Sequence, residues 1–177
     1  MKNVEFKAWP KIGRGNPFKA TITEKIDGTN ACVIVENGEV VGAQSRNRII
    51  TIKDDNYGFA AWVDSNKKEL SDLGDGYHYG EWAGLGIQKN PHLLGRKYFF
   101  LFNSLRWEDE RPSCCDVVPI LMKGNIGHHT ILKMLDVLES DGSTLGGKAE
   151  GIVIYHHASR SYTKHTIKMS DGKWMSE

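Results

Sequence analysis

One stretch of the sequence strongly constrains the fold: Asn37-Gly38 stands between two apolar runs, Ala31–Val35 and Val40–Gln44. Asn-Gly is a preferred pair for the two-residue type I′ turn, because both central positions of that turn need a positive φ. The flanking runs are rich in β-branched residues, which favour strands. The chain is therefore expected to contain an antiparallel β-hairpin here.

Short apolar segments elsewhere predict more strands than helices. Strands are expected at Ala20–Lys25, Tyr77–Trp82, Tyr98–Phe102, Gly151–His156 and Thr166–Met169. A helix is expected over Thr130–Glu139, where Ile131, Leu132, Leu135 and Leu138 recur at helical spacing. A second helix is expected within Tyr57–Leu70, with Phe59, Trp62 and Val63 facing inward. Because parallel βαβ units are not evident, the pattern favours an α+β fold built on antiparallel sheets.

Length and composition limit the class of protein. The chain has 177 residues, which predicts a single domain over 1–177. It contains no apolar run long enough for a membrane span, its first residues lack the apolar stretch of a signal peptide, and its three cysteines form no disulfide framework. A cytoplasmic protein is expected. The net charge is only +1, but residues 1–53 carry nine Lys/Arg against five Asp/Glu, so this basic third could face a polyanion.

The sharpest chemical feature is the segment Glu24-Lys25-Ile26-Asp27-Gly28-Thr29-Asn30. A lysine at the end of a predicted strand, followed at once by an Asp-Gly turn, would present its amine at a sheet edge. Such an amine can act as a nucleophile when its surroundings favour the neutral form. Taken alone, the segment is equally consistent with an exposed strand end and a turn.

Further segments in a fixed order give this lysine more weight. Lys25–Asn30 resembles motif I of the covalent nucleotidyltransferases, the superfamily of ATP-dependent RNA and DNA ligases and mRNA capping enzymes. The later segments are similar to motifs Ia, III, IIIa, IV and V: Ser45–Arg48, Tyr79–Trp82, Tyr98–Asn103, Glu150–Ile154 and Thr166–Met169. Within the superfamily, the sequence most resembles RNA ligases of the RNA ligase 2 type. The resemblance runs from Lys25 to Lys168.

The resemblance implies both a fold and a set of roles. The fold would be a nucleotidyltransferase domain of two antiparallel sheets with flanking helices, with ATP between the sheets. Lys25 would attack the α-phosphorus of ATP to form a lysyl-AMP intermediate, and Arg46 and Lys168 would supply positive charge at the phosphates. The remaining roles would fall to Glu81 at the ribose, Phe102 against the adenine, Glu150 at a Mg²⁺ or Mn²⁺ ion, Glu24 and Asn30 beside the nucleotide or substrate, and Arg46 and Arg48 at the nucleic acid strand.

The sequence departs from the family pattern in two motifs. Asn103 stands where motif IIIa usually carries Asp, so an acidic role there is in doubt. In motif V, Lys168 matches the first of two lysines and Ser170 occupies the place of the second, which leaves Lys164 or Lys173 as substitutes.

The implied activity is RNA ligation. AMP would pass to a 5′-phosphate strand end, and a 3′-hydroxyl would then displace it. An ATP-dependent DNA ligase, a capping guanylyltransferase and a non-catalytic nucleotide-binding or RNA-binding module remain alternatives. Because only a few residues follow motif V, no appended C-terminal domain is expected.

Overall fold

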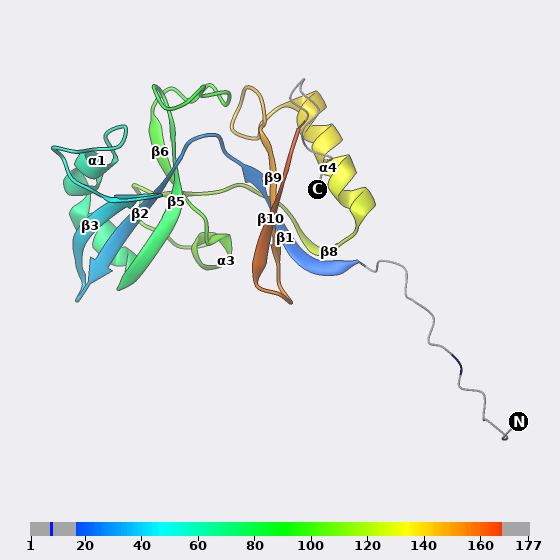
Figure 1. Ribbon diagram of the computed structural model, residues 1–177, viewed down its shortest axis with the longest axis horizontal. Coiled ribbons are helices and arrows are strands. Elements are labelled where there is room, and N and C mark those ends of the chain that lie inside the picture. Colours follow the sequence, from blue (N-terminus) through cyan, green and yellow to red (C-terminus); the bar gives the residue numbers. More distant parts are fainter. Residues whose placement is uncertain (1–7, 9–16, 168–177) are drawn as a thin grey trace, which may run out of the picture.

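The computed structural model describes Ala8 and residues 17–167, in which the strands form two sheets (Figure 1). The four-stranded sheet has the order β10-β9-β1-β8, with bounds Phe18–Lys25 for β1, Ile120–Ile126 for β8, Gly151–His156 for β9 and Ser161–Thr166 for β10. The six-stranded sheet has the order β4-β3-β2-β5-β6-β7, with bounds Thr29–Glu36 for β2, Glu39–Ser45 for β3, Ile49–Ile50 for β4, Gly76–Gly84 for β5, Lys97–Leu101 for β6 and Asp116–Val117 for β7. The expected α+β class is confirmed.

The helices lie mainly on the outer sides of the two sheets. Helix α4 (His128–Asp141) covers the four-stranded sheet, and α1 (Phe59–Ser65) lies at the opposite end of the molecule, beside the six-stranded sheet (Figure 1). The short elements α2 (Lys67–Leu70), η1 (Ser71–Leu73) and α3 (Ser104–Trp107) complete the set in the described part of the chain. None of these helices is long and apolar enough to cross a membrane.

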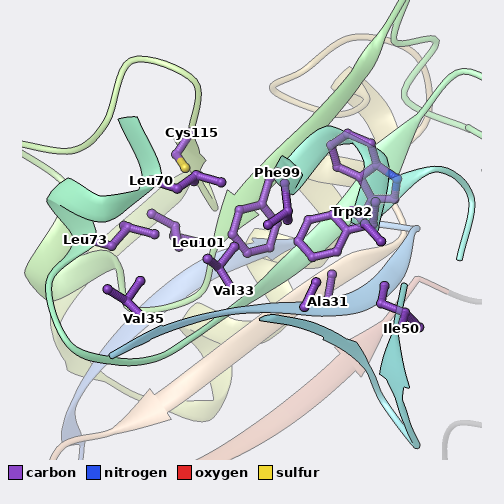
Figure 2. Close-up of a cluster of buried hydrophobic side chains, with 14 of the residues drawn as sticks. Ala31, Val33, Val35, Ile50, Leu70, Leu73, Trp82, Phe99, Leu101 and Cys115 are labelled. Atoms are coloured by element: carbon purple, nitrogen blue, oxygen red, sulfur yellow. The ribbon is translucent and has the colours of Figure 1, made fainter. Parts of the chain in front are cut away.

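Each sheet buries its own apolar core. In the six-stranded sheet, alternate residues of β2, Ala31, Val33 and Val35, pack with Trp82 and Phe99 beneath α1 and η1 (Figure 2). This period-two pattern is what a strand with one buried face requires. In the four-stranded sheet, Ala20, Ile22, Ile152 and Ile154 pack against Ile131, Leu135 and Leu138 of α4. A small third cluster joins the sheets and consists of Ile26, Ala83, Phe100 and Val118.

The predicted hairpin is confirmed. Strands β2 and β3 pair in antiparallel register, and Asn37 and Gly38 both have positive φ, at 53° and 75°. The helix expected over Thr130–Glu139 is also confirmed, and α4 extends it at both ends. The helix expected within Tyr57–Leu70 divides at Asn66 into α1 and α2, with Phe59 and Val63 buried and Trp62 packed partly against the same core.

The strand expected at Thr166–Met169 overlaps the observed strand only at Thr166, and its positions 168–169 lie outside the described residues. The observed strand β10 spans Ser161–Thr166, because the tight turn after His156 returns the chain at once along β9. Its residues are polar and largely exposed, so apolar patterning could not reveal it. The sheets are also not wholly antiparallel, since β7 pairs with β6 in parallel at the outer edge.

Candidate active site

A cavity of about 1110 Å³ lies between the two sheets and contains the predicted nucleophile. The four-stranded sheet contributes Thr21, Thr23, Lys25, Val153 and Tyr155, and the six-stranded side contributes Asn30, Arg46, Glu81 and Phe102. A cavity of this size is larger than a drug-sized ligand usually needs. It can therefore hold a nucleotide with room for a second group.

Lys25 occupies the last position of β1, at the rim of this cavity. Its register partner on β9 is Gly151, so the neighbouring Glu150 is brought beside it. Lys25 Nζ lies 2.5 Å from Glu150 Oε1, and both side chains are mostly buried. The structure thus brings the predicted nucleophile and the predicted metal-binding carboxylate together.

Gly28, in the turn after Lys25, is required by close packing. A Cβ atom at this position would lie 2.5 Å from the carbonyl oxygen of Trp82 and 2.9 Å from the Ala83 Cβ. The backbone of β5 cannot easily move away to relieve contacts this short, so position 28, in the turn after Lys25, requires glycine. The turn is therefore pressed against β5, the strand that carries Glu81.

Glu81 and Asn30 face each other across β5 and β2. They are register partners, and Asn30 Nδ2 donates a hydrogen bond to Glu81 Oε2 at 3.0 Å. Burial raises the pKa of the Glu81 carboxyl to about 7, although Lys25 and the Asn30 hydrogen bond oppose this rise. Asn30 therefore orients a carboxyl group whose charge changes close to neutral pH.

Phe102 lines the cavity just beyond the end of β6. Its backbone amide donates to the carbonyl of Tyr79, and its ring packs partly against the cluster that joins the sheets, which leaves it half-buried. The neighbouring Asn103 caps α3, since its side-chain oxygen accepts from the Arg106 amide at 3.3 Å. An amide performs this capping as well as a carboxylate does, which explains why Asn is sufficient at this position.

The two predicted arginines differ in their surroundings. Arg46 lines the cavity. Arg48 does not border it: its guanidinium pairs with the Asp54 carboxylate at 2.6 Å and also donates to backbone carbonyls of Asp54 and Asp55. The structure therefore brings Arg46, and not Arg48, to the lining shared with Lys25.

Glu24 borders the cavity but directs its carboxylate away from it. The residue is completely buried, and its Oε2 accepts two hydrogen bonds from Thr144, from the amide at 3.0 Å and from the hydroxyl at 2.6 Å. Its Oε1 lies 3.8 Å from Nδ1 of His92, a residue to which the sequence assigns no role. The expected contact of Glu24 with a nucleotide or substrate stays a prediction, and one of its carboxylate oxygens is held by Thr144.

Lys168, the predicted motif V lysine, lies outside the described residues, as does Lys173. Lys164, the other possible substitute, is described and lines the cavity from β10. Lys164 therefore supplies a lysine to the cavity wall that β10 forms.

One observation bears on a divalent cation. Glu150 Oε2 is buried and has no hydrogen-bond partner among the described residues, so within that part of the chain this oxygen is available to a cation. In residues 17–167, no group of three or more His, Cys, Asp or Glu side chains could form a complete cage. A single carboxylate suits Mg²⁺ or Mn²⁺ held mainly by waters and phosphate oxygens.

A lysine amine, an oriented carboxyl and an aromatic ring around a cleft between two sheets define a protein of the nucleotidyltransferase fold. The sequence model of the RNA ligase family matches residues 19–170, so the chain belongs to this family. No curated protein matches it significantly.

Solved structures support the fold. The chain is similar to the RNA ligase of Naegleria gruberi, in a variant solved with ATP and Mn (TM-score 0.64, 21% identity, 85% of this chain and 50% of that chain). It is also similar to another variant solved with AMP and Mn (TM-score 0.63, 21% identity, the same coverage) and to that ligase solved with PPi (TM-score 0.62, 21% identity, the same coverage). The chain thus spans about half the length of the solved relatives that it matches.

Proposed function

We propose that this chain supplies the nucleotidyltransferase activity of an ATP-dependent RNA ligase. The observation that carries the proposal is Lys25, whose amine stands at the rim of a nucleotide-sized cavity, 2.5 Å from Glu150. Membership of the RNA ligase family and the ATP and Mn bound by the Naegleria gruberi enzyme support it.

In the first step, Nζ of Lys25 attacks the α-phosphorus of ATP. An N–P bond forms, the P–O bond to the pyrophosphate breaks, and the amine gives up a proton. Glu150 Oε1 is close enough to receive that proton. Because this chemistry depends chiefly on position and charge, the groups that hold the nucleotide matter as much as the nucleophile.

The cavity offers a contact for each part of the nucleotide. The Phe102 ring would stack on the adenine, and Glu81, held by Asn30, would accept hydrogen bonds from the ribose hydroxyls. Arg46 would face the phosphates. Glu150 Oε2 would hold the Mg²⁺ or Mn²⁺ ion, which would neutralise charge on the phosphates.

The later steps use the stored AMP. The 5′-phosphate of an RNA end attacks the phosphorus of lysyl-AMP, and the N–P bond breaks to free Lys25. A 3′-hydroxyl then attacks the activated 5′-phosphate, forms the phosphodiester and releases AMP. Arg46 and Arg48, both exposed, would contact the strand.

The decisive test is the intact mass of the protein after incubation with ATP and Mg²⁺ or Mn²⁺. We expect the mass of one AMP to be added, and the adduct to disappear in Lys25→Ala. Lys19→Ala is the matched control, because Lys19 is an exposed lysine on the same strand. Absence of any adduct across metals and pH would contradict the proposal, and labelling by GTP but not ATP would identify a capping guanylyltransferase.

A second measurement separates RNA ligation from DNA ligation. RNA and DNA strands with identical sequences, 5′-phosphates and 3′-hydroxyls are offered to the adenylylated protein. We expect sealing of RNA. Sealing of DNA alone would favour the DNA ligase alternative.

A further inference from the structure

His92 is a completely buried histidine whose ring makes hydrogen bonds to two separate segments near the nucleophile. Only 1% of its surface is exposed, and it is not among the residues that line the cavity. It lies in the loop after β5, and its ring contacts the β1–β2 turn and the loop between α4 and β9. A polar ring buried this deeply must have a partner for each nitrogen.

The hydrogen bonds fix the proton on one ring nitrogen. Nε2 lies 3.0 Å from the backbone nitrogen of Asp27, which can only donate, so Nε2 must accept. Nδ1 then carries the proton and faces the Ser143 hydroxyl at 3.0 Å, with Glu24 Oε1 at 3.8 Å. If both ring nitrogens were protonated, the Nε2–H group would face the Asp27 N–H group, and neither could accept a hydrogen bond from the other. The contact therefore requires neutral His92, and burial lowers the pKa of the ring against the opposing effect of the Glu24 carboxylate.

His92 and its neighbour Pro91 make hydrogen bonds to the backbone close to both Lys25 and Glu150. Asp27 follows Lys25 by two residues. On the other side, Pro91, adjacent to His92, accepts a hydrogen bond at 2.8 Å from the amide of Lys148, which precedes Glu150 by two residues. The same loop also receives Gly147, where a Cβ atom would lie 2.2 Å from the Pro91 carbonyl oxygen.

We propose that His92 is a positioning residue for adenylylation: its Nε2 holds the Asp27 amide and so fixes the direction from which Lys25 approaches the nucleotide. The Ser143 hydroxyl, 3.0 Å from Nδ1, accepts the ring proton from behind, and the Glu24 carboxylate lies 3.8 Å from the same nitrogen. The inference rests on the proposed function, since it concerns the geometry of the same nucleophile. Because a displacement of about 1 Å can cost on the order of a hundredfold in rate, an anchor two residues away is sufficient to matter.

Two amide substitutions separate this role from general stability. The carbonyl oxygen of His92→Gln can reach the place of Nε2 and accept from the Asp27 amide, whereas His92→Asn reaches only the place of Nδ1. The rate of lysyl-AMP formation is followed by intact mass in a single turnover over a range of ATP concentrations. We expect His92→Asn and His92→Ala to lower the maximal rate about tenfold or more, and His92→Gln to stay within about threefold of the wild type.

The ATP concentration for half-maximal rate should change little in all three variants, because His92 does not line the cavity. His129→Gln, an exposed histidine on α4, is the matched control. A wild-type rate in His92→Asn would overturn the proposal, and so would a His92→Gln variant as slow as His92→Ala.

Two measurements do not depend on catalysis. Nitrogen NMR of the wild-type ring should report a neutral His92 with its proton on Nδ1, and a proton on Nε2 would overturn the proposal. Hydrogen exchange of the Asp27 amide should be at least about tenfold faster in His92→Asn than in the wild type and in His92→Gln. If the wild-type protein forms no AMP adduct, the proposed function fails, and these two measurements alone decide whether His92 holds the turn.

Discussion

Lys25 Nζ and Glu150 Oε1 lie 2.5 Å apart, although 125 positions separate the two residues in the sequence. The antiparallel pairing of β1 with β9 brings them together, because it sets Lys25 opposite Gly151. One Glu150 oxygen contacts the amine, and the other is buried with no hydrogen-bond partner in the part of the chain that the structure describes. The carboxylate can therefore serve the nucleophile and a cation at once.

Glu150→Gln should separate these two duties. The amide still offers an oxygen to Lys25, but it cannot take the lysine proton and has no negative charge for a cation, so the Mn²⁺ dependence of the rate is what reports the metal. We expect adduct formation to fall on the order of 10–100-fold and the Mn²⁺ concentration for half-maximal rate to rise. Glu139→Gln, an exposed position on α4, controls for the loss of one charge. An unchanged Mn²⁺ dependence would refute the assignment of Glu150 to the metal.

Phe102→Ala should weaken nucleotide binding. Loss of a base-stacking ring costs about 1–3 kcal/mol, which corresponds to roughly 5–150-fold in affinity. The equilibrium dissociation constant for ATP, measured by calorimetry in the Lys25→Ala background to prevent turnover, checks this. Phe102→Tyr keeps the ring and should bind normally. Equal affinity in the alanine variant would mean that Phe102 only fills the core.

The raised pKa of the Glu81 carboxyl predicts that the free energy of unfolding depends on pH. Since the pKa of this carboxyl is raised to about 7 in the folded protein, from an ordinary value of 4.5, folding favours the protonated carboxyl. Its contribution to the free energy of unfolding is fully present below about pH 4.5 and is lost as the pH rises through 7.

Thermal unfolding of Glu81→Gln against wild type between pH 5 and 8 tests this. The Tm of Glu81→Gln should rise relative to that of the wild type as the pH increases. Each kcal/mol of difference in the free energy of unfolding should correspond to about 2–4 °C in Tm. A constant difference across this range would rule out the raised pKa.

Lys168→Ala should strongly reduce adenylylation, because the resemblance makes Lys168 the motif V cation at the phosphates. Lys164→Ala is the informative companion, since Lys164 lines the cavity from β10. We expect the larger loss in Lys168→Ala, measured as the single-turnover rate of adduct formation. Near-normal activity in that variant would overturn the motif V assignment, and a large loss in Lys164→Ala alone would transfer the role to Lys164.

Local chemistry determined what the sequence could predict. The Asn37-Gly38 hairpin and the apolar face of α4 depend on residues close together in the chain, and both were predicted correctly. A strand over 161–165 was not predicted, because the polar residues of β10 gain their structure from pairing with β9.

In the candidate site too, residues within short motifs could be predicted from the sequence, and contacts between distant segments could not. Motif order was sufficient to select Lys25, Glu81 and Glu150, and the structure places them around one cavity or at its rim. The buried contacts of Glu24 with Thr144, and of His92 with Asp27, bridge 120 and 65 positions. No local pattern encodes such contacts, so Glu24 was expected at the nucleotide and His92 received no role.

The two sheets keep separate cores and share only the small cluster of Ile26, Ala83, Phe100 and Val118. Lys25 belongs to one sheet and Glu81 to the other, and the cluster lies beside both, because Ile26 follows Lys25 directly and Ala83 follows Glu81 by two residues. A change of side-chain volume at Ile26 should therefore act on the packing beside both Lys25 and Glu81, whereas a change in either large core acts mainly on one sheet.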